Sequence, residues 1–292
     1  MAIAKSHSDW AMQFGRTELE LCKSSIPDSI VTMSEQSRRT GLHLVTAEIA
    51  LPDCGLCPHR ESVLAAGRCQ PGDRCLIAHS GRQIDRFLSQ NPEYADACLN
   101  DAFWERRAIA VRYASPERVA ELAADPDEVV RRAVAIRLPV TELVPLRHDP
   151  DREVRITVAA RLPLAWLAEM MHDPDYLVRQ HVAERLPHGR LPRMADDPDR
   201  EVRKAVARRL PAFALKRMVN DADDGVRRIV AARMLPEDAA GLLADPDWLV
   251  RLEAARHAPM QAIAELIDDP EPDVQALVRA RLEEFLKQEV LP

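Results

Sequence analysis

The sequence predicts an all-α solenoid of 24-residue repeats that follows a small cysteine-rich domain. Three observations predict it: a string related to Asp-Pro-Asp returns every 24 residues, four cysteines lie together upstream of it, and glycine is unevenly used. Six of the nine glycines lie at or before Gly81, so loops that need glycine belong to the first third of the chain. The repeated units open at Asp101 (a degenerate copy), Asp125, Asp149, Asp173, Asp197, Asp221, Asp245 and Asp269.

The composition divides the chain into three parts. Residues 1–40 are polar and without a period, so we expect a disordered extension, and Met33 is a candidate for the true start. Residues 41–100 form the four-cysteine domain, and residues 101–292 form the solenoid of about eight repeats. Neither a signal core nor an apolar run of membrane-spanning length is present, so we expect a soluble, cytoplasmic protein without membrane contact.

Each repeat begins with an expected α-helix, as in the unit that runs from Asp125 to His148. Asp125 suits the helix N-cap, Pro126 suits the first helical position, and Pro139 ends the helix. Apolar residues at helical spacing form one buried stripe, which consists of Val130, Ala133, Val134 and Leu138.

About nine residues then remain before the next unit, too few for a second full helix. They carry two apolar residues three apart, a spacing that suits a short 3₁₀ turn because positions i and i+3 eclipse. We therefore expect one α-helix and one 3₁₀ segment per unit, with these apolar pairs buried between units. The pairs are Leu143 and Leu146, Leu167 and Met170, Leu191 and Met194, and Leu215 and Met218.

Arginines recur with the same period and form two rows. The first row is Arg107, Arg131, Arg155, Arg179, Arg203, Arg227 and Arg251. The second row is Arg137, Arg161, Arg185, Arg209 and Arg233. Because aspartates share this period, we expect the arginines to pair bidentately with aspartates at neighbouring helix starts. The alternative is a groove for phosphate or for an acidic partner.

One unit, from Asp197 to Asn220, has an excess of basic residues and is the candidate partner surface. A charged, solvated face is the structural alternative. The candidate residues for contact with a partner are Arg200, Arg203, Lys204, Arg208, Lys216 and Arg217.

The four upstream cysteines predict a metal site. Their spacing is C-x2-C-x11-C-x5-C, and the candidate ligands are Cys54, Cys57, Cys69 and Cys75. In a reducing cytoplasm clustered cysteines are metal ligands rather than disulfides, and four thiolates suit either zinc or a [4Fe–4S] cluster. The second pair, C-x5-C, departs from a zinc ribbon and favours iron–sulfur, although zinc stays open. His59 and His79 lie close by, and we expect packing or charge-tuning roles for them.

Bulk properties argue against two classes of function. The net charge of −7 and an aromatic content of 4% count against nucleic-acid binding. The sequence contains no Walker loop, dinucleotide fingerprint or nucleophile-elbow motif, so we expect no enzymatic activity.

Two stretches resemble the leucine-rich repeat variant (LRV) family: the DPDxxVRxxVAxRLP pattern from Asp197 to Pro211 and the block from Ser80 to Ala114. The resemblance covers roughly residues 41 to 292. It implies a small [4Fe–4S] domain ligated by Cys54, Cys57, Cys69 and Cys75, followed by a right-handed superhelix of alternating α and 3₁₀ helices. It also implies a setting near nitrogen fixation, but no defined activity.

The expected function is therefore that of a non-catalytic iron–sulfur repeat protein. Its superhelical surface would bind a macromolecular partner, most simply a protein, because solenoids present long surfaces to partners. The cluster would serve as a structural cap or as a sensor of redox state or oxygen. Two alternatives are an electron-transfer protein that docks a redox partner, and a nucleic-acid-binding solenoid that uses its arginine rows.

Overall fold

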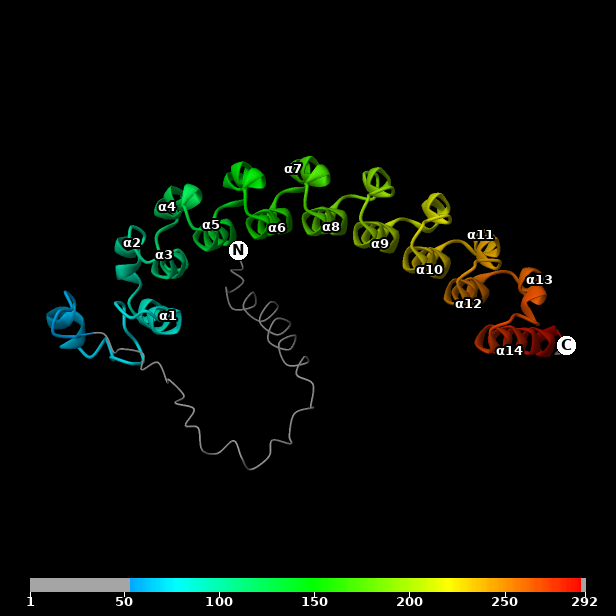
Figure 1. Ribbon diagram of the computed structural model, residues 1–292, viewed down its shortest axis with the longest axis horizontal. Coiled ribbons are helices and arrows are strands. Elements are labelled where there is room, and N and C mark those ends of the chain that lie inside the picture. The colour runs from blue at the N-terminus through cyan, green and yellow to red at the C-terminus, as the bar shows by residue number, and fades with distance from the viewer. Residues whose placement is uncertain (1–52, 290–292) are drawn as a thin grey trace, which may run out of the picture. The chain divides into compact units, whose positions relative to one another are not determined.

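The computed structural model describes residues 53–289, with side chains to residue 287. Two compact units divide the chain, Met1–Ala50 and Leu51–Pro292, and the description below concerns the second. The predicted extension over residues 1–40 and the candidate start at Met33 lie outside the described residues. No β-strand occurs among residues 53–289, and long and short helices alternate along the chain from residue 104 onward (Figure 1). The all-α prediction is confirmed.

Every repeat contains one long α-helix, whereas the short connecting segment differs in helix type from repeat to repeat. The long helices are α3 (Trp104–Ala110), α5 (Glu128–Arg137), α6 (Arg152–Arg161), α8 (Tyr176–Arg185), α9 (Arg200–Arg209), α10 (Asp224–Arg233), α12 (Trp248–His257) and α14 (Pro272–Glu289). The purely 3₁₀ connections are η5 (Val140–Glu142), η6 (Val144–His148), η8 (Leu191–Met194) and η9 (Ala212–Met218).

The other connections begin with one four-residue α turn before the 3₁₀ segment. They are α4 (Pro116–Val119) with η4 (Ala120–Ala124), α7 (Leu164–Leu167) with η7 (Ala168–His172), α11 (Pro236–Ala239) with η10 (Ala240–Leu242), and α13 (Met260–Ile263) with η11 (Ala264–Leu266). Upstream of the repeats lie the π-helical turn η2 (Arg60–Leu64), α1 (Gly81–Gln90), η3 (Pro92–Tyr94) and α2 (Ala95–Cys98).

The long helices lie side by side in one layer and the short segments form a second layer (Figure 1). A continuous apolar core fills the space between them. In the Asp125 unit, Val130, Val134 and Leu143 are completely buried. The predicted Leu/Met pairs are buried in every unit where they were expected, whereas Ala135 takes the core position that the periodicity assigned to Ala133.

The helix N-cap is the second aspartate of each Asp-Pro-Asp string, not the first. Asp127 has extended backbone dihedrals, and its carboxylate accepts a hydrogen bond from the Val129 N–H at 3.0 Å. Asp125 instead accepts from the backbone N–H of Asp127 at 2.9 Å. The prediction that Asp125 caps the helix was therefore wrong by two residues. Equivalent caps are Asp151, Asp175, Asp199, Asp223 and Asp247.

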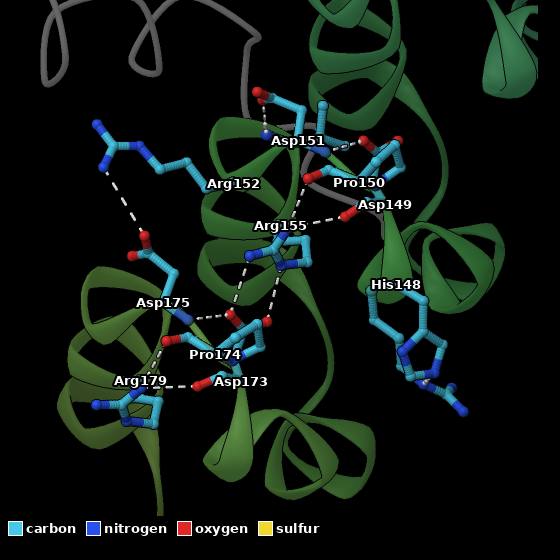
Figure 2. Close-up of polar contacts among 12 residues, drawn as sticks. His148, Asp149, Pro150, Asp151, Arg152, Arg155, Asp173, Pro174, Asp175 and Arg179 are labelled. Atoms are coloured by element: carbon cyan, nitrogen blue, oxygen red, sulfur yellow. Dashed lines mark hydrogen bonds and ion pairs between the residues drawn. The ribbon is translucent and has the colours of Figure 1, made fainter. Parts of the chain in front are cut away.

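The first aspartate is displaced from the cap because an arginine of the preceding unit binds it. Arg179 donates from Nε and Nη2 to the two carboxylate oxygens of Asp197 at 2.8 and 3.0 Å. Its remaining Nη1 donates to the carbonyl of Asp173, at the start of its own unit, at 2.7 Å. Arg155 binds Asp173 in the same way (Figure 2). We call this arrangement the arginine clip.

The arginine clip joins every pair of successive units. It is formed by Arg107–Asp125, Arg131–Asp149, Arg155–Asp173, Arg179–Asp197, Arg203–Asp221, Arg227–Asp245 and Arg251–Asp269. These side chains are largely excluded from water; those of Arg179 and Asp197, for example, are 11% and 6% exposed. The predicted pairing of the first arginine row is thus confirmed, and its guanidinium groups are committed to the interior of the stack.

The second arginine row has a different partner from the one that the sequence predicted. Arg209 donates to the carbonyls of Ala183 and Leu186 at 2.7 Å each, at the C-terminus of the long helix one unit earlier. These carbonyls have no partner within their own helix, and a cation there also complements the helix dipole. The row therefore caps helix C-termini rather than pairing with aspartates. His257 interrupts the row and Arg281 resumes it.

We predict that Arg179→Ala lowers the free energy of unfolding by about 1–3 kcal/mol, because the substitution leaves the buried Asp197 carboxylate without its charged donor. Arg179→Lys should recover only part of the loss, since an ammonium cannot donate in parallel to both oxygens. Urea titration followed by circular dichroism measures both effects. Arg132→Ala is the matched control, because Arg132 is exposed on α5 and should change stability by less than about 0.5 kcal/mol. Equal losses at the two sites would refute the role of the clip.

The clip at the last unit predicts a dependence of stability on pH. Hydrogen bonding from Arg251 holds the pKa of Asp269 below its ordinary value. A carboxylate with a depressed folded-state pKa contributes stability above the unfolded pKa of about 3.9, and this contribution disappears as the pH falls through the folded value. The difference in unfolding free energy between wild type and Arg251→Gln should therefore be constant from about pH 7 to 5 and shrink below about pH 4. A constant difference at every pH would contradict this account.

Candidate metal centre

The first pair of cysteines lies on a tight turn. The carboxylate of Asp53 accepts the Gly55 N–H at 2.7 Å, and the Leu56 N–H donates to the Asp53 carbonyl at 3.2 Å. Cys54 and Cys57 are half-buried at either end of this turn, and the side chain between them, Leu56, is 84% exposed. The C-x2-C turn therefore lies at the surface of the described chain.

The second pair of cysteines flanks another tight turn. Gln70 and Arg74 exchange backbone hydrogen bonds of 2.9 and 2.7 Å, with Gly72 at a positive φ of 86° between them. Cys69 precedes this turn and Cys75 follows it, and the Cys69 thiol donates to the Arg74 carbonyl at 3.2 Å. Five intervening residues thus bring two thiols to the base of one loop. The sequence comparison with a zinc ribbon did not foresee this geometry.

Buried polar groups attach the cysteine segment to the helices that follow it. Asn91 is fully buried, and its side-chain amide donates to the carbonyls of Arg68 and Phe87 at 3.2 and 2.9 Å. Arg106, on α3, donates from Nε to the Leu76 carbonyl at 2.8 Å. The cysteine loops are therefore fixed to α1 and to the first long helix of the repeats.

The four thiols share one electrostatic environment. Burial raises the pKa of Cys69 to about 11, and the neighbouring thiols of Cys75, Cys57 and Cys54 raise it further. Burial also raises the pKa of Cys75, while backbone N–H groups of Ile77 and Ala78 act in the opposite direction by donating to its sulfur. Thiolates at such positions need a cation to compensate their charge, and bound iron or zinc provides one.

The chemistry of the donor set fits an iron–sulfur cluster. Four cysteine thiols act on one another electrostatically, and such a cluster is held by four thiolates. Backbone N–H groups of Ile77 and Ala78 favour the thiolate form of Cys75, as a cluster ligand needs.

The two nearby histidines and the fifth described cysteine have packing roles. His59 packs edge-on against Tyr94 with ring centroids 5.3 Å apart, and His79 packs against Phe103 at 5.1 Å. Cys98 is 5% exposed and lies in the apolar core, as expected for a small hydrophobic residue. The packing role expected for both histidines agrees with these contacts.

The candidate partner residues do not form one face. Arg203 belongs to an arginine clip and is bound to Asp221 at 2.7 Å. Arg200 and Lys204, on the long helix α9, both lie within 4 Å of carboxylates, with Lys204 Nζ 3.0 Å from Glu201.

The remaining three candidates lie in both layers. Arg208 is exposed near the end of α9, whereas Lys216 and Arg217 are exposed on η9, in the short-helix layer. Lys216 forms a salt bridge of 3.1 Å with Asp238 of the next unit. The sequence could not separate the two groups, because both lie in a single 24-residue unit and only the layering divides them.

The geometry defines a class: a repeat protein of stacked α and 3₁₀ segments with a four-cysteine domain at its N-terminal side. Residues 50–97 match the family described as "LRV protein FeS4 cluster", and residues 152–175, 176–199 and 200–223 match "Leucine rich repeat variant". A solved structure titled "a leucine-rich repeat variant with a novel repetitive protein structural motif" is 54% identical, with a TM-score of 0.77 over 79% of this chain and 99% of that one. The chain belongs to the leucine-rich repeat variant family and carries an iron–sulfur cluster domain.

One curated relative is named for its own genomic position. The "uncharacterized 27.7 kDa protein in nifB 3'region" of Rhodobacter capsulatus is 41% identical over 87 residues, which are 30% of this chain. The match spans about a third (35%) of the length of that relative. No helix in the described part of the chain combines the length and apolar character needed to cross a membrane.

Gly67 offers a test of the loop geometry around the cysteines. It has a φ of 69°, and a β-carbon added there would touch nothing within 4 Å, so Gly67→Ala adds backbone strain without a clash. We predict a loss of roughly 1–2 kcal/mol in unfolding free energy. Gly189→Ala is the control, since that position is equally open and its φ is not positive; it should be neutral or slightly stabilising. Urea titrations of the metal-loaded protein compare them, and equal effects would refute the strain argument.

Proposed function

We propose that this protein is a non-catalytic iron–sulfur repeat protein that binds a protein partner through its solenoid surface. The observation that carries the proposal is that the arginines which recur every 24 residues are used inside the stack: the first row forms the arginine clips and the second row caps helix C-termini. The period therefore builds a stack, and the side chains that vary from unit to unit are left for recognition. The cysteine domain continues this stack on its N-terminal side.

We propose that the metal centre is a [4Fe–4S] cluster held by Cys54, Cys57, Cys69 and Cys75. Such a cluster supplies either a rigid crosslink between loops or a one-electron redox centre. The protein holds the two cysteine turns against α1 and α3 through Asn91 and Arg106, so the crosslink would cap the apolar core at that end. At this end of the stack the cluster would act as a structural cap. In a cytoplasmic protein it could instead act as a sensor of redox state or of oxygen.

The match to a relative encoded beside nifB supports a link to nitrogen fixation. The relative shares only part of its length with this chain, so the link is part of the proposal. It would place the protein in cells that maintain low oxygen around metal clusters, where a cluster-based sensor has a use.

Electron transfer is the second candidate, and one observation favours it. Cys54, Cys57 and Cys69 are each partly exposed, and Leu56 between the first pair is 84% exposed, so a bound cluster would lie close to the surface. Short separation from a docked redox partner is what an electron carrier needs. The arginine rows do not favour the third alternative, nucleic-acid binding, because their guanidinium groups point into the stack.

The proposed ligands predict a clear metal content. Protein purified without oxygen should contain about four iron and four acid-labile sulfide per chain, with a visible absorption band. Cys69→Ser should lose this iron, whereas Cys98→Ala, at a buried cysteine outside the site, should retain it. Iron, zinc and sulfide assays on both variants measure the outcome. About one zinc and no sulfide in protein from its native host would overturn the cluster.

The same preparation separates the two candidate roles. A band that bleaches reversibly with dithionite would favour an electron carrier or a redox sensor. An unreduced cluster, whose removal unfolds the segment before α3, would favour a structural cap. Bleaching without any change in partner binding would leave electron transfer as the better account.

A further inference from the structure

Uncompensated positive charge lies on the short-helix layer of two successive units. Arg190, Arg193 and Arg217 are exposed, and none forms a salt bridge with any residue in the described range 53–289. The cations on the long helix α9 differ, because Arg200 and Lys204 lie beside carboxylates and the charge of Arg208 acts on Glu184, whose pKa it helps to lower. The short-helix layer is thus the face on which the basic region keeps free charge.

Two aromatic side chains are exposed on the same layer. Phe213, on η9, is 73% exposed, and Trp166, on α7 two units earlier, is 46% exposed. Aromatic residues make up only 4% of the chain, so two exposed on the short segments of three successive units are a notable concentration. Aromatic and arginine side chains are the residue types that most often anchor protein partners.

Side chains of adjacent units reach one another in this layer. Arg147 and Glu169, from successive units, lie 2.9 Å apart, and Lys216 lies 3.1 Å from Asp238 of the next unit. The arginines and aromatics described above lie on this layer in three successive units. We name this set the short-helix patch, and its residues are Trp166, Arg190, Arg193, Phe213 and Arg217.

The positive charge of the patch is confined along the stack. Positions equivalent to Arg193 and Arg217 carry Glu169 one unit earlier and Gly241 one unit later. A long polyanion such as a nucleic acid would extend beyond the two cationic units to units whose equivalent positions carry no cation. A short acidic segment matches the extent of the patch, and apolar side chains in that segment could cover the exposed aromatic rings.

We propose that the short-helix patch binds a short acidic segment of a protein partner, with apolar side chains of that segment packed on Phe213 and Trp166. This inference rests on the proposed partner-binding function and assigns its surface and chemistry. Carboxylates can accept parallel hydrogen bonds from the free guanidinium groups, which fixes orientation as well as charge. The net charge of −7 repels acidic partners from the rest of the molecule, so the patch would direct their approach.

A peptide selection on the full metal-loaded protein tests the proposal. A displayed library of random 12-residue peptides is selected for binding, and the composition of the enriched peptides is compared with the input. We expect enrichment of aspartate and glutamate together with leucine or aromatic residues. Fluorescence anisotropy then measures the affinity of one labelled, enriched peptide at low and high salt.

Charge reversal distinguishes the patch from other surfaces. Arg193→Glu with Arg217→Glu should weaken binding of the enriched peptide at least ~10-fold and reduce its salt dependence. Phe213→Ala should weaken it by a similar factor. The matched control is Arg132→Glu with Arg228→Glu, which makes the same change of charge at exposed arginines of the long-helix layer and should leave affinity unchanged.

Each other outcome overturns the inference in a different way. Enrichment that survives the patch substitutions, or that is lost in the control, would move binding elsewhere and leave the partner-binding function standing. No enrichment at all would count against both. Tighter binding of a labelled 20-nucleotide strand that the patch substitutions abolish would make the patch a nucleic-acid site. A dimer in gel filtration that they abolish would assign it to a second copy of the chain.

Discussion

The arginine clip is the interaction on which the rest of the structure depends. A single unit of one α-helix and one short turn buries too little apolar surface to be stable alone, so it must be held against its neighbours. The clip does this with one side chain, which donates to the aspartate of the next unit and to the carbonyl that opens its own unit. Because both contacts are made by one planar group, the clip fixes the distance between successive helix starts.

Much of this stack could be predicted from the sequence, and the failures share a physical cause. The period, the buried Leu/Met pairs and the pairing of the first arginine row followed from spacing alone. The N-cap was misassigned because Asp125 and Asp127 both suit a cap chemically, and only the contact from Arg107 decides between them. The second arginine row was misassigned because backbone carbonyls, its partners, have no sequence signature. Contacts between units, rather than propensities within one, decided each case.

The candidate site, too, was only partly predictable from the sequence. Four cysteines in two pairs were visible as a metal site, but the base of the Gln70–Arg74 turn, where five spacer residues bring two thiols together, was not. The basic unit was visible as a charge excess, whereas the layering decides which of its cations lie beside carboxylates, as Arg200 and Lys204 do, and which, such as Arg217, form no salt bridge within the described chain. Composition finds the charged segment, and only the fold tells which charges remain available.

The two ends of the clip series show how the cysteine domain enters the stack. Among the described residues, no arginine from before Asp101 binds it; Asp101 pairs instead with Arg106 at 2.5 Å, and Arg106 also donates to the Leu76 carbonyl in the cysteine segment. At the other end Gln275 replaces the arginine and keeps only the carbonyl contact, with Asp269, at 2.7 Å. The cysteine domain therefore stands in the place of a unit. In a stack coupled between nearest neighbours, a change at the cluster acts first on α3 and must cross several clips before it reaches the short-helix patch. A sensor of this design would work most directly through a partner that contacts both regions.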